Sequence, residues 1–244
     1  MSCQPSRMNT VYKWLNNNQH CLLCAQPAHS PVPLCTDCEV ELPWLGPHCR
    51  ICAIPLAAEG LACGECLRKP PAFTHVEAAW RYRYPVDSLI TGFKHQSRWP
   101  QGRLLAELLA AHLRHAFDHG LPRPAFLLPV PLTKRRLRQR GFNQAGLLAN
   151  WLGQALELPV ESSWLLRLQD APAQQQLDAA ARKRNLRQAF GLAGHARITG
   201  QHLALVDDVM TTGATAEAAA RLLIKAGAAR VDLYCLARTP RPGD

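Results

Sequence analysis

Eight of the ten cysteines form four CxxC pairs, and these pairs constrain the N-terminal part of the chain more than any other feature. The first cysteines of the pairs lie at positions 21, 35, 49 and 63, a strict period of 14 residues. Two residues between cysteines let one tight turn aim both thiolates at one ion, and two such turns complete a tetrahedral shell around zinc. The pattern predicts two structural zinc ions, held by Cys21, Cys24, Cys35, Cys38, Cys49, Cys52, Cys63 and Cys66.

Disulfides and a redox-active CxxC are the alternatives to zinc. Disulfides suit small exported chains, and redox motifs do not normally come in four evenly spaced copies. Consecutive pairing of the four CxxC turns is favoured, but spacing alone also allows a cross-braced arrangement. A segment of about 55 residues buries little apolar surface, so metal binding would supply most of its folding free energy.

The remaining chain is long enough for one larger domain. Of 244 residues, 48% are hydrophobic and 19% charged, which is typical of a globular protein. We expect an N-terminal extension over residues 1–20, a double zinc ribbon over 21–70 and the larger domain over 75–244. No apolar run is long enough to cross a bilayer, and the N-terminus lacks the apolar core of a secretory signal. The sequence therefore predicts a cytoplasmic protein without membrane insertion.

The positive charge is concentrated in the larger domain. Residues 1–74 hold five basic and five acidic side chains, so the net charge of +10 comes entirely from the residues that follow. This distribution makes the larger domain the part to examine for binding of polyanions.

The larger domain alternates strand-like and helix-like segments. Strands are expected at 76–84, 125–130, 160–168, 203–206 and 230–238, and helices from Pro85 through 95, at 101–117, 141–156 and 214–227. Such alternation predicts an α/β fold with a mainly parallel sheet flanked by helices on both faces. Ligands of these folds collect at the carboxyl ends of the strands.

One of these strand ends carries the string HLALVDDVMTTGAT, residues 202–215. The turn and the first helical residues would offer free backbone N–H groups to a phosphate, and two adjacent acids would accept hydrogen bonds from a sugar diol or reach a hydrated Mg²⁺. Helix capping alone would explain one acid better than two. The string resembles the phosphoribosyl pyrophosphate (PRPP) motif of type I phosphoribosyltransferases. The resemblance assigns PRPP binding to Asp207, Asp208, Thr211, Thr212, Gly213, Ala214 and Thr215, with catalysis centred on the two aspartates.

A basic run follows the second expected strand, in what we interpret as a strand-to-helix loop. It holds five cations, which are either a solvated face or a binding site for pyrophosphate or a nucleic-acid backbone. The candidate residues of this loop are Lys134, Arg135, Arg136, Arg138, Arg140 and Gly141. A glutamine- and alanine-rich connection over residues 168–190 is interpreted either as a mobile lid or as an exposed surface helix.

In their order along the chain, the tandem CxxC module, PVPL with RGFNQA, the element Arg182, Asn185 and Phe190, and VDDVMTTGAT resemble the ComF family. The resemblance implies a double zinc ribbon before a type I phosphoribosyltransferase-like domain, with Arg182 and Asn185 in the hood over the ligand. It also implies a link to natural competence and to the use of external DNA. Similarity of fold to transferases does not establish that transfer occurs.

Two functions are consistent with these features. In the first, the protein acts in the uptake or utilisation of DNA. It would bind PRPP with Mg²⁺ and single-stranded DNA, and contact proteins of the uptake machinery. The aromatic side chains of Trp80, Tyr82, Trp99 and Phe142 are candidates for base stacking, although most such residues are core. The alternative is an active phosphoribosyltransferase of nucleobase salvage without a role in DNA. PRPP could also be replaced by a related sugar phosphate.

Overall fold

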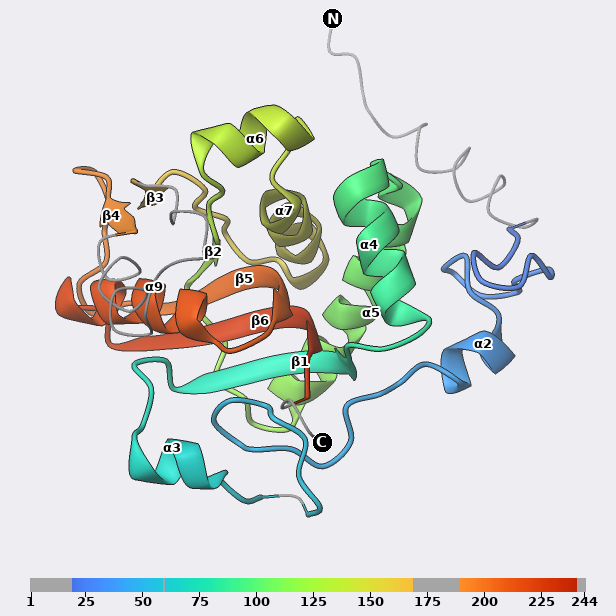
Figure 1. Ribbon diagram of the computed structural model, residues 1–244, viewed down its shortest axis with the longest axis horizontal. Coiled ribbons are helices and arrows are strands. Elements are labelled where there is room, and N and C mark those ends of the chain that lie inside the picture. Colours follow the sequence, from blue (N-terminus) through green and yellow to red (C-terminus); the bar gives the residue numbers. More distant parts are fainter. Residues whose placement is uncertain (1–18, 59, 169–188, 241–244) are drawn as a thin grey trace, which may run out of the picture. The chain divides into compact units, whose positions relative to one another are not determined.

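The computed structural model describes residues 19–58, 60–168 and 189–240 (Figure 1). The expected lid lies almost wholly outside these residues, as do Arg182 and Asn185. The chain divides into two compact units, Met1–Leu42 and Pro43–Asp244, and the boundary falls between the second and third CxxC pairs. The described part of the first unit contains helix α2, Thr36–Val40, which begins directly after Cys35.

A four-stranded parallel sheet organises the second unit. Its strand order is β1 (His75–Arg81), β6 (Arg230–Arg238), β5 (His202–Met210) and β2 (Phe126–Pro129). The central strands are buried along nearly their whole length, which explains their continuous apolar runs. All three pairings are parallel, so the carboxyl ends of the four strands meet at one edge.

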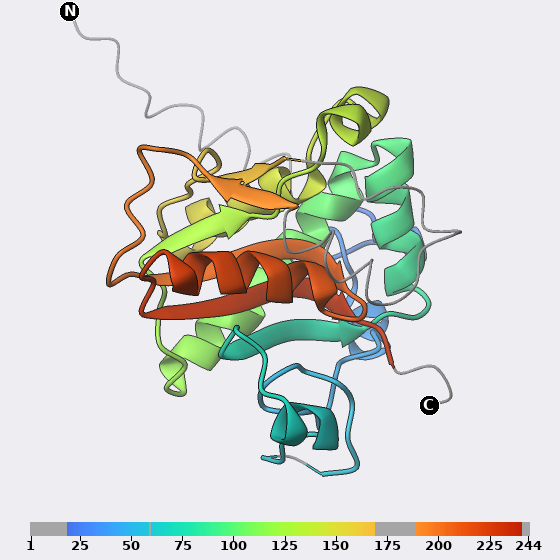
Figure 2. The same cartoon turned by 60° about the vertical axis from the view of Figure 1, so that its left-hand side comes forward.

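Helices cover both faces of this sheet. Helices α4 (Val86–Gln96), α5 (Trp99–Asp118) and α7 (Gln144–Leu156) pack on one face, and α9 (Ala214–Lys225) lies along β5 and β6 on the other (Figure 2). The alanine-rich face of α9 lets it approach the sheet closely, with Ala219 and Ala220 fully buried. The expected fold class, a mainly parallel sheet flanked by helices, is confirmed.

The second zinc ribbon segment is built onto the outer edge of this sheet, beneath β1 in both views. The chain leading into it forms an isolated antiparallel bridge to β1 between Trp44 and Trp80, with hydrogen bonds from Leu45 N to Ala79 O (3.0 Å) and from Arg81 N to Pro43 O (2.8 Å). Helix α3, Gly64–Arg68, follows Cys63. All four cysteines of this segment belong to the same apolar core as α9 and the sheet.

Three expectations about local structure are wrong in detail. The basic run is not a loop but a short helix, α6 (Lys134–Arg140), because the Thr133 side chain caps its first turn and Gly141 ends it at φ +79°. The segment 160–168 is not one strand of the main sheet: Val160 forms an isolated parallel bridge with Leu127 of β2, and β3 (Leu165–Arg167) pairs with β4 (Phe190–Leu192) in a separate antiparallel ribbon. Strand β5 does not end before the aspartates, because its pairing with β6 continues to Met210.

Candidate functional site

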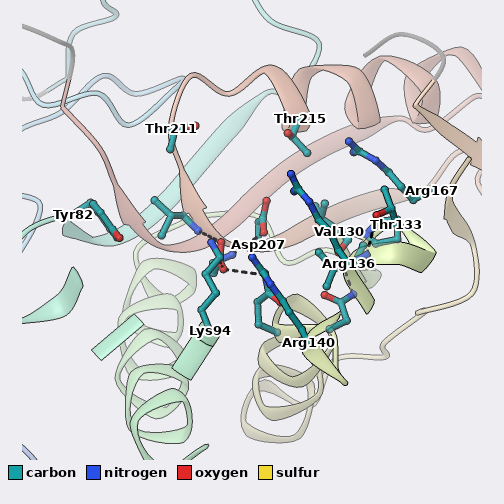
Figure 3. A pocket seen from close by; sticks show the side chains of 16 residues that line it. Tyr82, Lys94, Val130, Thr133, Arg136, Arg140, Arg167, Asp207, Thr211 and Thr215 are labelled. Carbon is teal, nitrogen blue, oxygen red and sulfur yellow. Dashed lines mark hydrogen bonds and ion pairs between the residues drawn. The ribbon is translucent and has the colours of Figure 1, made fainter. Parts of the chain in front are cut away.

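A cavity of about 360 Å³ lies at the carboxyl edge of the sheet (Figure 3). Strand β5 and the turn that follows it supply one side, α6 and the start of α7 another, and Lys94 of α4 and Tyr82 a third. Six of the sequence-predicted residues line it: Arg136, Arg140, Asp207, Asp208, Thr211 and Thr215. The two stretches of sequence that suggested a ligand site, 65 or more residues apart, therefore face one cavity.

The two adjacent carboxylates have different surroundings. Asp208 is buried, and its Oδ2 forms an ion pair with Lys94 Nζ (2.9 Å) and accepts a hydrogen bond from Gln144 Nε2 (3.2 Å). Asp207 Oδ1 accepts the backbone N–H of Asp208 at 2.9 Å. Burial, together with the neighbouring Asp208 charge, raises the pKa of Asp207 to about 7. The site thus holds a carboxyl group that gains or loses a proton near neutral pH.

The turn after β5 and the start of α9 bring two hydroxyl groups to the same cavity, those of Thr211 and Thr215, whereas the predicted residues Thr212, Gly213 and Ala214 are not part of its lining. Thr211 and Thr212 are exposed, and the Thr212 hydroxyl oxygen accepts the backbone N–H of Ala214 at 3.3 Å. Gly213 adopts φ +75°, a left-handed conformation that strongly favours glycine. Helix α9 begins at Ala214 with no side-chain cap, which leaves the positive end of its dipole toward the turn.

Helix α6 adds cations on the opposite side. Arg136 and Arg140 line the cavity and their side chains extend into it in Figure 3. Lys134, Arg135 and Arg138 are exposed on α6 and are not part of the cavity lining. The basic run therefore divides into two arginines that face the cavity and three cations that face solvent.

Several cavity residues carry no recognisable sequence signal. Lys94 and Arg167 are the main examples, because each lies in an ordinary helical or strand pattern. Gln144 lies in the RGFNQA stretch but is not among the predicted site residues. Asn143 could have been found as the cap of α7, since its Oδ1 accepts Ala145 N at 3.2 Å while its Nδ2 donates to Val130 O at 3.1 Å. These contacts fix the start of α7, and with it Gln144, against the end of β2.

Gln144 brings a buried acceptor, without a partner in the described part of the chain, to the lining of the cavity. Gln144 is 3% exposed and its Oε1 accepts no hydrogen bond from the described residues. An acceptor in this state costs stability unless a ligand or bound water supplies a donor. Together with this amide oxygen, the two neighbouring carboxylates form a group of oxygen ligands that suits a hydrated Mg²⁺ or a sugar hydroxyl.

The eight cysteines of the CxxC pairs form two clusters, each with four Sγ atoms within 4.8 Å of one another. The clusters are Cys21, Cys24, Cys35 and Cys38, and Cys49, Cys52, Cys63 and Cys66, so the pairing is consecutive. In the second, Ile51 N and Cys63 N donate to Cys49 Sγ at 3.5 and 3.2 Å. Although burial opposes ionisation, such backbone donors lower the pKa of Cys21 to about 6 and of Cys49 to about 7. Closed sets of four thiolates support structural zinc at both sites.

Comparisons with known proteins agree with both parts of the chain. The double zinc ribbon domain matches residues 15–67, and the phosphoribosyl transferase domain matches residues 169–243. Among solved structures, a purine phosphoribosyltransferase from Pyrococcus horikoshii is 20% identical, with 60% of this chain and 79% of that chain covered and a TM-score of 0.35. Among the described residues, no helix is long and apolar enough to cross a membrane.

Curated relatives cover nearly the whole chain. DNA utilization protein YhgH of Salmonella typhi is 37% identical over 225 residues, which are 90% of this chain and 96% of the relative. Competence protein F of Haemophilus influenzae is 34% identical, with 91% and 97% covered, and competence protein ComFC of Bacillus subtilis is 28% identical, with 84% of each covered. With the zinc ribbon, the phosphoribosyltransferase domain and these relatives together, the chain belongs to the ComF family.

Proposed function

We propose that the chain binds PRPP, or a closely related sugar phosphate, with Mg²⁺ in the cavity at the carboxyl edge of the sheet. The observation that carries this proposal is the convergence of two carboxylates, an uncapped helix start and two arginines on one cavity. Asp207 and Asp208 would hold the ribose diol, and the turn over residues 211–215 would hold the 5′-phosphate. Arg136 and Arg140 would pair with the pyrophosphate oxygens. Mg²⁺, when bound, would neutralise pyrophosphate charge.

Single-stranded DNA is the proposed second ligand, in keeping with the name of the relative from Salmonella typhi, a DNA utilization protein. Support comes from the exposed cations of α6 and from two neighbouring aromatic rings, Trp99 and Phe142, whose centroids lie 6.0 Å apart. Trp99 is 49% exposed, so its ring can stack on a base. Trp80 is fully buried and cannot, and Tyr82 lines the cavity instead. We place the chain in the uptake or utilisation of external DNA, in the cytoplasm, with uptake proteins as partners.

Calorimetric titration of the zinc-loaded protein with PRPP and Mg²⁺ tests the first part. We expect saturable 1:1 binding, and heat unchanged from buffer would refute the proposal. Adding nucleobases and measuring pyrophosphate release separates a binding protein from the alternative, a salvage transferase. Release that depends on one base and is indifferent to DNA would favour the transferase.

A salt series tests the second part. Binding of a labelled DNA oligonucleotide should weaken by orders of magnitude between low and high salt, since several phosphates are contacted. Reversing two exposed charges, Arg135→Glu with Arg138→Glu, should weaken DNA binding strongly and leave PRPP affinity nearly unchanged. An equal loss of affinity for DNA and for PRPP would show that the two sites overlap.

A further inference from the structure

Arg238 connects two parts of the second unit, the second four-cysteine site and the end of β5 beside the cavity. The proposed function gives this connection no role. It is the last residue of β6 and is 6% exposed. Its Nε donates to Cys52 O at 2.9 Å, and its Nη1 donates to Met210 O (3.1 Å), to Thr211 O and to Thr239 O (2.8 Å). One buried guanidinium thus contacts the backbone of a zinc-site cysteine and the backbone of the turn that borders the cavity.

The chemistry of these contacts makes the arrangement sensitive to position. A buried guanidinium needs its donors satisfied, and all four of these hydrogen bonds go to backbone carbonyl oxygens. Carbonyl groups move only with their chain segments, so a shift of the segment at Cys52 changes the support of the carbonyls at Met210 and Thr211. Thr211 lies at the rim of the cavity (Figure 3).

We propose that Arg238 is a positioning residue that couples the second four-cysteine site to the phosphate-binding turn at residues 210–213. The turn keeps its geometry only while Cys49, Cys52, Cys63 and Cys66 are held together, as bound zinc would hold them. The identity of the ligand rests on the proposed function, whereas the coupling itself concerns the turn. Because coupling is reciprocal, a ligand that fixes the turn also retards loss of metal from this site.

The first four-cysteine site provides an internal control. Its cysteines occupy the same positions in the 14-residue repeat, but they belong to the other compact unit, and Cys24 is exposed. Arg81 provides a second control, because it pairs in register with Arg238 and its Nε donates to Leu45 O at 3.1 Å. Arg81 thus ties the ribbon segment to the sheet by a similar bond that does not reach the turn.

Hydrogen exchange measured by mass spectrometry on the full zinc-loaded chain tests the coupling without any ligand. Arg238→Lys keeps the charge, but a single ammonium cannot span both sets of carbonyls. We expect it to retain two zinc ions per chain by atomic absorption and to exchange at least about tenfold faster in residues 209–217, as after loss of a charge-assisted hydrogen bond. Arg81→Lys should leave this peptide unchanged.

Metal removal gives the matching comparison. Cys66→Ser should speed exchange of residues 209–217, while Cys38→Ser, its equivalent in the first site, should not; a peptide from α7 reports whether each variant is folded. If Cys66→Ser does not fold, Arg238→Lys decides. An unchanged turn in Arg238→Lys, or an equal effect of Arg81→Lys, overturns the proposal.

PRPP with Mg²⁺ then tests reciprocity in the wild-type protein. It should slow chelator extraction of one of the two zinc ions, and this protection should be lost in Arg238→Lys. Protection of neither ion despite calorimetric binding overturns the coupling. Absence of calorimetric binding refutes the proposed function instead, and the exchange comparison still decides the coupling.

Discussion

Acidic side chains lie at both ends of the parallel sheet, and the two ends surround them differently. At the amino edge, Glu77 bonds to His75 Nε2 at 2.7 Å and to His112 Nε2 at 2.8 Å. Asp232, fully buried, bonds to His202 Nε2 at 2.7 Å and to Arg230 Nε at 3.0 Å. Although burial opposes ionisation, the two histidines lower the pKa of Glu77 to about 2.

At the carboxyl edge, one of the two carboxyl groups has a pKa raised well above its usual range. Asp207 and Asp208 are neighbours in sequence, and burial raises the pKa of Asp207 to about 7. Lys94 contacts Asp208, and Gln144 Oε1 stays without a donor among the described residues. Carboxylates that are paired and lie away from a cavity are typical of groups that stabilise a fold. A carboxyl group with a shifted pKa that lines a cavity is typical of a ligand site. We therefore expect substitutions at the amino edge to change stability and substitutions at the carboxyl edge to change ligand binding.

The largest expected effect tests the binding edge. Replacing both acids, Asp207→Asn with Asp208→Asn, removes two charge-assisted contacts and should weaken PRPP binding by about 100-fold or more in calorimetry. The free energy of unfolding should change by less than about 1 kcal/mol, because the like-charge repulsion disappears together with the partly exposed Lys94 pair. A variant that binds normally would remove the basis for placing the ligand here.

The amino edge should respond in the opposite way. Asp232→Asn leaves Arg230 and His202 without their buried partner and should lower the free energy of unfolding by about 3 kcal/mol in urea denaturation. PRPP affinity should stay within about twofold of wild type, since the cavity is at the far edge. Loss of affinity at unchanged stability would contradict the division between the two edges.

The pH dependence of affinity and of stability should also differ between the two edges. An acid with a pKa near 7 is protonated below that value, so a contact that needs the Asp207 carboxylate weakens about tenfold for each unit below pH 7. The same shift makes the folded chain bind more protons than the unfolded one between about pH 4 and 7, so stability falls as pH rises there. Glu77, with its pKa lowered, contributes stability that is lost only as pH falls from about 4.5 toward 2. Calorimetry across about pH 5 to 8 measures the change in affinity, and urea denaturation across about pH 3 to 8 measures the two changes in stability. A flat affinity would contradict the expectation for Asp207.

The sequence predicted much of this edge because its signals are local. A few residues were enough to predict the local backbone in each case. These signals are the apolar runs at 203–206 and 230–238, the paired aspartates and the turn ended by Gly213. The period of the cysteines likewise indicated both metal clusters, and the structure settled their consecutive pairing. Helix α6 could also have been predicted from its cap residues, Thr133 and Gly141. The high charge of the run led to the prediction of a loop instead.

Partners that come from distant segments could not be predicted. Lys94 lies 114 residues before Asp208, and nothing in the α4 pattern marks it as a charge partner. Arg238 contacts Cys52 across 186 residues. Such pairs depend on how helices pack on the sheet, which a local pattern does not specify. The roles of Arg182 and Asn185 in the hood stay predictions, because both lie outside the described residues.

The smallest effect concerns Lys94, whose charge opposes the rise in the pKa of Asp207. Lys94→Met should therefore move the midpoint of the pH-dependent affinity upward, by less than about one unit for a lysine that is a quarter exposed. Lys94→Arg keeps the charge and should leave the midpoint in place. The ionisation of the ligand is common to all three proteins, so a difference between their midpoints reports the carboxyl group alone. A midpoint that moves downward in Lys94→Met would mean that another group controls binding, and that the unbalanced charge at this edge does not shape the response to pH.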